Sequence, residues 1–280
     1  MQNILIVDCF CTNKPNAGNP AAVVTEFQGG DREKLALAKK LNQPVTVFIA
    51  NQDSHEPTIQ FFYPEAKMPL CIHGTLAAAK IILPKDQLAI NFKTDDGKTL
   101  AVRKQKKNIY EVKVERHDFA KPIIKNEDIL RMLNLQDTDS INNTLPLCIE
   151  SAGSSKLLIP LTTLTLLQDL QPNFELIKQW SIQNKINGLY VYTDQTSSET
   201  ADFHARGFNP KTGHNEDAAT GVAAAALSLA LQKNISIEQG HSINMPCLIT
   251  VSYINQKTVY VGGVVSDSKQ TGFQYTMPTS

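Results

Sequence analysis

The sequence predicts an α+β fold made of two pseudo-symmetric lobes, each a curled, mostly antiparallel sheet or barrel around a central helix. Two observations support this prediction. A motif at residues 62–79 returns at 208–225, an offset of 208 − 62 = 146 residues, and each copy runs from an aromatic-x-Pro strand end into an alanine-rich helix. The chain also contains many short strand patterns around these two helices, which favours curled sheets over a doubly wound parallel sheet.

The first half of the chain is typical of short strands interrupted by two helices. A helix is expected from Asp31, which fits an N-cap, through Leu41, and the first alanine-rich helix is expected at 75–83, before Pro84. β-Branched and aromatic runs predict strands at 4–10, 21–25, 45–50, 58–63, 88–92, 99–102 and 110–114.

A domain junction is expected at 116–125, where the composition changes and the periodicity stops. We therefore place the N-terminal lobe at 1–117, completed by a C-terminal strand near 270–280, and the C-terminal lobe at 118–269. The second half repeats the plan of the first. Helices are expected at 127–134, 173–184 and 220–231, and strands at 156–161, 188–193, 203–208, 249–254 and 259–265.

Length and charge limit the possible functions. A chain of 280 residues has room for about two domains, and Lys+Arg equals Asp+Glu at 27 each, so no nucleic-acid partner is expected. Small molecules are the expected ligands. The first residues run into a strand without a basic segment, which predicts no signal peptide and a cytoplasmic protein. The most apolar helical run, 218–231, is too short to span a bilayer, so no membrane contact is expected.

Cysteine and histidine spacing predicts neither a disulfide framework nor a metal site. The five cysteines are an odd number in a chain without a secretion signal, which favours reduced thiols. Cys9 and Cys11 are more simply two small core residues than ligands. His55, His117 and His204 show no ligand spacing. We expect no metal and no cofactor.

Six motifs occur in the order found in a known family. They are Asp8-x-Phe10 with 17–24, then 46–48, 62–64 with 69–75, 208–210 with 216–221, 238–240 and 261–263. On these motifs the chain resembles the phenazine-biosynthesis PhzF-like family, within the diaminopimelate-epimerase fold, over essentially its whole length. The resemblance implies the two-lobed fold, a homodimer, and an isomerase whose characterised member moves a proton between carbons of a cyclohexadiene amino acid.

The chain also departs from the family pattern. The family's general acid/base glutamate lies just before Thr46, where this chain has Val45, and a valine cannot transfer a proton. Ile72 replaces the glycine between the cysteine and histidine of the first motif, and Val222 replaces a serine after the second Gly/Thr pair. The scaffold is therefore kept, while part of the family's reaction chemistry is altered.

Proton transfer at carbon needs a base, an acid and a fixed site for the substrate carboxylate. The candidate catalytic residues are Asp217, His73 and Cys71, and the offset places Cys71 opposite Asp217, since 71 + 146 = 217. Structural roles stay open for all three: a buried thiol, a hydrogen-bonded histidine and a helix cap. Helix N-termini attract anions, so the candidate substrate-binding residues are Gly74, Thr75, Thr220 and Gly221, together with Asn19.

Three functions follow from this pattern. The favoured one is an isomerase or epimerase that moves a proton at a carbon of a small carboxylate or amino-acid-like substrate in the inter-lobe cleft. The second is a non-catalytic carboxylate-binding protein, which Val45 and Val222 favour. The third is a structural or partner-binding protein, against which the retention of His73 and Asp217 argues.

Overall fold

The computed structural model describes residues 2–106, 108–268 and 273–275, which fall into two compact units. The N-terminal unit comprises chain segments 1–13, 17–113 and 262–280, and the C-terminal unit comprises 14–16 and 114–261. Of the strand expected near 270–280, residues 270–272 and 276–280 lie outside the described residues, and Phe273–Tyr275 forms β17, which pairs with β1 (Gln2–Cys9).

The strands of the N-terminal unit close into a barrel. Its ladder runs β1, β2, β3, β4, β6, β7, β8 and β16, and β16 pairs back with β1. Outside this ladder, the short strand β5 pairs with β4. Their bounds are β2 Asn19–Thr25, β3 Thr46–Ala50, β4 Thr58–Phe62, β5 Lys67–Met68, β6 Ala89–Thr94, β7 Thr99–Lys106, β8 Ile109–Glu115 and β16 Thr258–Asp267.

The C-terminal unit repeats this ladder, as the sequence repeat predicts. Pairs β9–β10, β11–β12 and β14–β15 are antiparallel and pairs β10–β11 and β12–β14 are parallel, the same series as β1 through β7. The bounds are β9 Cys148–Ser151, β10 Ser155–Pro160, β11 Leu189–Thr193, β12 Phe203–Asn209, β13 His214–Asp217, β14 Ile235–Gln239 and β15 Cys247–Asn255. The predicted fold class, two pseudo-symmetric lobes of curled sheet, is confirmed.

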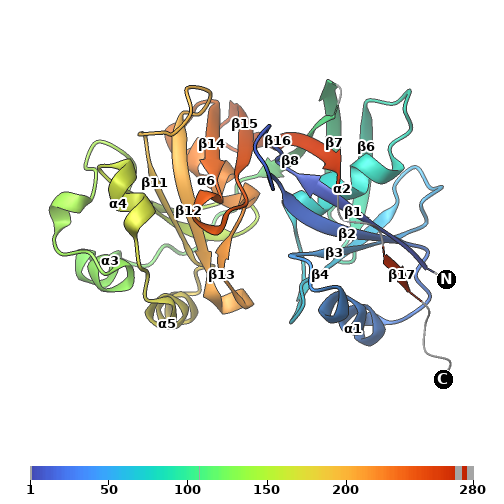
Figure 1. Ribbon diagram of the computed structural model, residues 1–280, viewed down its shortest axis with the longest axis horizontal. Helices are drawn as coiled ribbons and strands as arrows, with labels where there is room; N and C mark the ends of the chain where they lie inside the picture. Colours follow the sequence, from blue (N-terminus) through green and yellow to red (C-terminus); the bar gives the residue numbers. More distant parts are fainter. Residues whose placement is uncertain (1, 107, 269–272, 276–280) are drawn as a thin grey trace. The chain divides into compact units, whose positions relative to one another are not determined.

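Each unit buries one alanine-rich helix against its strands (Figure 1). Helix α2 (Ile72–Ile82) packs against β1, β2 and β3, and its first eight residues are all buried. Helix α6 (Gly221–Leu231) packs against β9, β10 and β15 and is buried almost throughout. A helix that is apolar on every side needs cover on every side, and the curled sheets provide it.

The remaining helices cover the outer faces of the sheets (Figure 1). Helix α1 (Asp31–Leu41) packs on β3 and β4, with Leu37, Ala38 and Leu41 buried in a cluster with Phe48 and Phe62. In the C-terminal unit, α3 (Asn126–Leu133), α4 (Leu164–Asp169) and α5 (Phe174–Asn184) enclose a second core. Short 3₁₀ helices occur at Thr138–Ser140, Pro210–Thr212 and His241–Ile243. No helix among the described residues is long and apolar enough to cross a membrane.

The repeat is less regular at the helix starts than at the strands. Helix α6 starts one residue after the predicted start at 220, but α2 begins at Ile72, three residues before the predicted start at 75. The two helices therefore begin 221 − 72 = 149 residues apart, not 146. The prediction of a constant offset through the helix is wrong by about one turn, because the second copy keeps 218–220 outside the helix, in a buried turn after β13 that ends at the N-cap Thr220.

Candidate functional site

The first candidate element is the start of α2 in the N-terminal unit. Cys71 is the N-cap, with extended backbone angles (φ −145°, ψ 115°), and its carbonyl oxygen accepts a hydrogen bond from Thr75 N at 3.0 Å. The helix can approach the sheet closely because Gly74 has no side chain: a Cβ there would lie 2.8 Å from Cγ2 of Val47. The sheet therefore fixes the position of the first helical turn.

Cys71 and His73 lie in contact at this turn. The Cys71 Sγ is 3.3 Å from His73 Nδ1, and the Tyr63 hydroxyl donates a longer hydrogen bond to the same sulfur at 3.8 Å. Both residues are buried, and Cys9 on β1 donates from its thiol to the carbonyl oxygen of His73 at 3.2 Å. A thiol and an imidazole at this distance can exchange a proton, so the pair is able to take part in acid/base chemistry.

Three of the predicted substrate-binding residues are enclosed in the N-terminal unit. Gly74 faces Val47, as described, and the Thr75 hydroxyl donates to the Cys71 carbonyl oxygen at 2.7 Å. Asn19 begins β2 opposite Cys9 and is fully buried. Any anion held at this helix start would therefore meet backbone N–H groups of the first turn rather than the Thr75 hydroxyl.

The second candidate element is the turn between β13 and α6 in the C-terminal unit. Asp217 ends β13 opposite Gly207, and Thr220 is the N-cap of α6. The Asp217 carboxylate accepts from the Thr220 hydroxyl at 3.0 Å and from Ala219 N at 3.4 Å. Asp217 is half-buried, so the carboxylate is both oriented and accessible.

Gln239 holds this turn in place. Its amide nitrogen donates to the Asp217 carbonyl oxygen at 2.7 Å and to the Thr220 hydroxyl at 3.0 Å. Its amide oxygen accepts from Thr220 N and from the buried Tyr190 hydroxyl, both at 3.1 Å. The sequence motif at 238–240 indicated family resemblance but gave Gln239 no role, because its partners are 19 to 49 residues away.

A lysine that the sequence analysis did not single out lies fully buried in the same unit. The ammonium group of Lys156 on β10 donates to the carbonyl oxygen of Asn187. Burial lowers the pKa of Lys156 to about 8, against the opposing effect of the Asp217 charge, and the charge of Lys211 lowers it further. Lys156 is thus a buried basic group in electrostatic contact with the candidate catalytic carboxylate.

Val45 is fully buried immediately before β3. Side chains alternate along an extended strand, so Val45 lies on the same face as Val47, whose methyl group approaches Gly74 of α2. Val45 therefore faces the helix whose first turn contains Cys71 and His73.

The structure divides the candidate residues between the two units. Cys71, His73, Gly74 and Thr75 lie at one helix start, and Asp217, Thr220 and Gly221 lie at the other. The pairing of Cys71 with Asp217 across one substrate carbon stays a prediction. Among the residues that the structure describes, one group could hold a metal ion, His204, Glu238 and His241, and it contains none of these residues.

Comparison with known proteins identifies similar chains. The model of the phenazine biosynthesis-like protein family matches residues 7–264. An uncharacterized isomerase of Clostridium acetobutylicum is 32% identical over 243 residues, covering 82% of this chain and 78% of that protein. An uncharacterized isomerase of Bacillus subtilis is 27% identical over 256 residues, covering 83% of this chain and 84% of that protein.

Solved structures show the same fold. A Bacillus anthracis phenazine biosynthesis protein of the PhzF family aligns with a TM-score of 0.82 at 22% identity, covering 98% of this chain and 99% of that one. A probable proline racemase from Agrobacterium radiobacter aligns with a TM-score of 0.56 at 10% identity, covering 97% and 94%. At these identities the likeness concerns the fold alone.

Proposed function

The chain belongs to the phenazine biosynthesis-like family, and on this basis we propose that it is an isomerase that moves a proton at a carbon atom of a small carboxylate or amino-acid-like substrate. We propose no cofactor for this step. The substrate class follows from the acid/base residues and the two helix starts, which favour a carboxylate.

One observation supports this function most strongly, the arrangement of Asp217. Its carboxylate is held by Thr220 and Ala219 at the start of α6, yet it is half-buried rather than enclosed. A carboxylate that only capped the helix could be fully covered, whereas a proton carrier must reach its substrate. The Gln239 bonds fix the turn, which limits the motion of the carboxylate during the reaction.

The proposed reaction is a proton shift. Asp217 takes a proton from a carbon next to an electron-withdrawing group, and the electron pair of the broken C–H bond delocalises into the substrate. When Asp217 returns this proton to another carbon, the isomer forms and the enzyme is restored. When a second group instead protonates the other face of the same carbon, exchange of protons with water returns both groups to their starting states. We propose Asp217 as the proton carrier, and the Cys71–His73 pair, with Sγ and Nδ1 3.3 Å apart, as the other acid/base group that the sequence motif singles out.

The test is conversion of small carboxylates by the Asp217→Asn variant. The panel contains cyclic and acyclic amino acids and the cyclohexadiene amino acid of the family, with isomers separated by chiral chromatography. For a substrate that the unmodified chain converts, Asp217→Asn should lower kcat by about 10²- to 10⁴-fold with little change in KM, and His73→Asn should lower it as well. Asp194→Asn, an exposed carboxylate in the same unit, is the matched control and should change neither value. An Asp217→Asn variant as active as the control would contradict the assignment.

We also propose that the chain acts as a homodimer, as the family resemblance implies. Sedimentation equilibrium of the full chain should give twice the 30.9 kDa chain mass. A single species at the chain mass would contradict this assembly.

A further inference from the structure

A second group of reactive side chains lies on the other face of the C-terminal sheet. Strands β12 and β14 pair in parallel, with His204 directly opposite Glu238. Because side chains alternate along a strand, Glu238 and Gln239 point to opposite faces. Gln239 binds the turn that holds Asp217, so His204 and Glu238 lie on the face away from the candidate active site.

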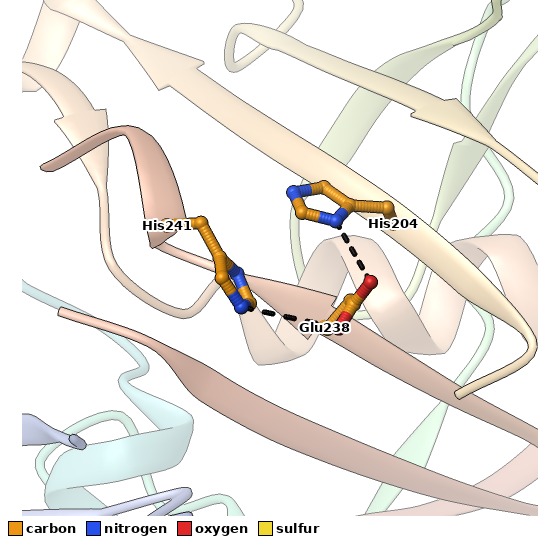
Figure 2. A group of neighbouring side chains, drawn as sticks. All are labelled: His204, Glu238 and His241. Atoms are coloured by element: carbon orange, nitrogen blue, oxygen red, sulfur yellow. Dashed lines mark hydrogen bonds and ion pairs between the residues drawn. The ribbon is translucent and has the colours of Figure 1, made fainter. Parts of the chain in front are cut away.

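A sharp turn at Gly240 places the third member of the group, His241, next to Glu238. Gly240 has φ +83°, and a Cβ there would lie 2.2 Å from the carbonyl oxygen of Met245 and 2.7 Å from that of Ala218. The turn leads into the 3₁₀ helix at His241–Ile243, which returns the imidazole to Glu238 three residues earlier. Figure 2 shows the two imidazole rings on either side of the carboxylate.

The donor atoms have the spacing of an incomplete metal site. His204 Nδ1 is 2.9 Å from Glu238 Oε1, and His241 Nε2 is 3.9 Å from Glu238 Oε2. All three ligand atoms lie within 4.8 Å of one another. Zinc ligands lie about 2.0–2.2 Å from the ion, so in a tetrahedral site two of them are about 3.4 Å apart. A small rotation of His241, the most exposed of the three side chains, would close the remaining gap.

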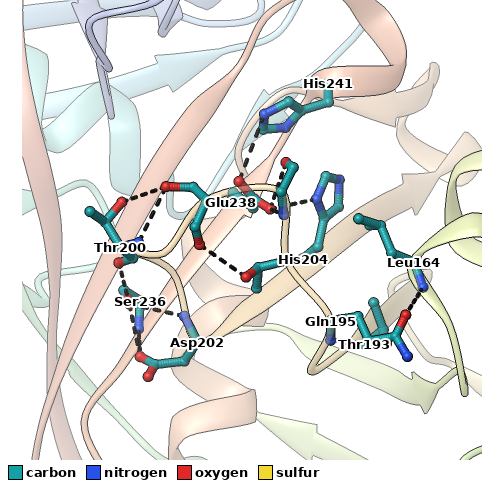
Figure 3. Close-up of polar contacts among 12 residues, drawn as sticks. Leu164, Thr193, Gln195, Thr200, Asp202, His204, Ser236, Glu238 and His241 are labelled. Carbon is teal, nitrogen blue, oxygen red and sulfur yellow. Dashed lines mark hydrogen bonds and ion pairs between the residues drawn. The ribbon is translucent and has the colours of Figure 1, made fainter.

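The Glu238 carboxylate is oriented by the loop at 194–202. Ser197 donates to Oε1 from its backbone N–H and, at 2.8 Å, from its hydroxyl. The loop is tied to β14 by the Ser236 hydroxyl, which donates to the Thr200 carbonyl oxygen at 3.1 Å and to Asp202 at 2.8 Å, as Figure 3 shows. Outer-shell bonds of this kind hold metal-binding carboxylates in position. The other carboxylate oxygen, Oε2, lies 3.9 Å from His241 Nε2 and faces the centre of the group.

We propose that His204, Glu238 and His241 bind one divalent transition-metal ion, and that Zn²⁺ is the ion that this donor set suits. Two imidazole nitrogens and one carboxylate oxygen are ligands of zinc, and a water molecule would complete a tetrahedron. The spacing along the sequence predicted no metal, because His204 is 34 residues from Glu238 and the strand pairing that joins them is not visible in a local pattern.

One neighbouring residue competes with the ion. The exposed Lys14 side chain places Nζ 3.1 Å from His241 Nε2. An ammonium group there donates to the lone pair that a metal ion would use, and its positive charge repels the ion. Metal binding must therefore displace Lys14, and removing its charge should strengthen binding.

The experiment is a Zn²⁺ titration of the full chain, stripped with a chelator, against a chromophoric zinc indicator. We expect one equivalent to bind. His241→Ala should weaken binding by about 100-fold or more, since loss of an outer-shell partner alone costs 10- to 100-fold. His117→Ala, an exposed histidine in the same unit, is the control and should bind as the unmodified chain does. Lys14→Met should tighten binding by about tenfold, an electrostatic gain of about 1.4 kcal/mol.

Several outcomes would overturn the proposal. They are no binding by the unmodified chain, equal binding by His241→Ala, or weaker binding by Lys14→Met. Circular dichroism of each variant separates loss of the site from loss of the fold. Substitution of Co²⁺ gives a second readout, because an N/O-coordinated tetrahedral ion has a visible absorption band that the His241→Ala variant should lack.

Discussion

At the scale of single residues, the sequence identified candidate catalytic residues but not their surroundings. Cys71 and His73 are two residues apart, and their contact could be anticipated from the motif. The partners of Asp217 could be anticipated only in part. Thr220 is three residues away, but Gln239 binds the turn from β14, and Lys156 on β10 interacts electrostatically with Asp217. Burial of a lysine is not visible in a local pattern, because the residues that cover it are distant in sequence.

Val45→Glu tests whether the valine at position 45 prevents this chain from catalysing the reaction of the family's characterised member. Val45 faces α2, so a carboxylate there would lie in a dry environment that raises its pKa and makes it a usable acid/base. The unmodified chain should fail to isomerise the family's cyclohexadiene amino acid, and Val45→Glu should gain trace activity, limited by Ile72 and Val222. Val45→Gln is the matched control. Strong activity of the unmodified chain, or equal activity of the Gln and Glu variants, would show that position 45 does not decide this reaction.

Lys156→Met tests the energetic cost of the buried lysine. The pKa of Lys156 is lowered to about 8, so between pH 8 and 10.5 the folded chain has lost a proton that the unfolded chain retains. The free energy of unfolding therefore rises with pH in this window. Below pH 8 the buried ammonium group destabilises the folded chain to its full extent. Lys156→Met removes that cost and should stabilise the chain at pH 7 by on the order of 3 kcal/mol.

The measurement is urea unfolding of the unmodified chain and of Lys156→Met at pH 7 and near pH 9.5. The stability difference between them should shrink as the pH rises. Lys178→Met, an exposed lysine in the same unit, should show no such trend. A difference that stays constant with pH would mean that Lys156 keeps its ordinary pKa.

At the scale of elements, most strands were predicted from their apolar and β-branched runs, but β14, which ends in two buried polar residues, was not. Strand β14 reads Ile-Ser-Ile-Glu-Gln, and the sequence analysis did not assign it. Its Glu238 and Gln239 are buried by His204 on one face and Thr220 on the other. The start of α2 was missed for a related reason, since a buried helix can include Ile72 and His73 before its alanines begin.

Gly207→Ala tests whether close packing of β12 against the turn before α6 keeps Thr220 hydrogen-bonded to Asp217. A Cβ at position 207 would lie 2.4 Å from the Thr220 hydroxyl and 3.1 Å from the Gln239 amide nitrogen. Relief of this overlap would move Thr220 away from Asp217 at a cost of about 1–3 kcal/mol in stability. We expect lower kcat as well as a lower melting temperature. Gly30→Ala, where the nearest atom is a flexible Glu33 carboxylate oxygen, is the control. Unchanged kcat in Gly207→Ala would mean that the Thr220–Asp217 bond is dispensable.

At the scale of the whole molecule, the repeated motif was sufficient to predict the architecture. Both ladders use the same order of antiparallel and parallel pairs, and in each the alanine-rich helix connects a parallel pair, β4–β6 or β12–β14. Duplication preserves strand pairing because backbone hydrogen bonds do not depend on the side chains that differ between copies. The chemistry at the two helix starts is not duplicated: one presents Cys71 and His73, the other Asp217.

The central claim is that Asp217 exchanges a proton with a substrate carbon. The most direct test is the rate at which a substrate C–H group, followed by proton NMR in deuterated water, takes up deuterium with the unmodified chain and with Asp217→Asn. The account predicts exchange by the unmodified chain and a loss of at least about 100-fold in Asp217→Asn, with substrate still bound. Exchange at an unchanged rate in Asp217→Asn would contradict it.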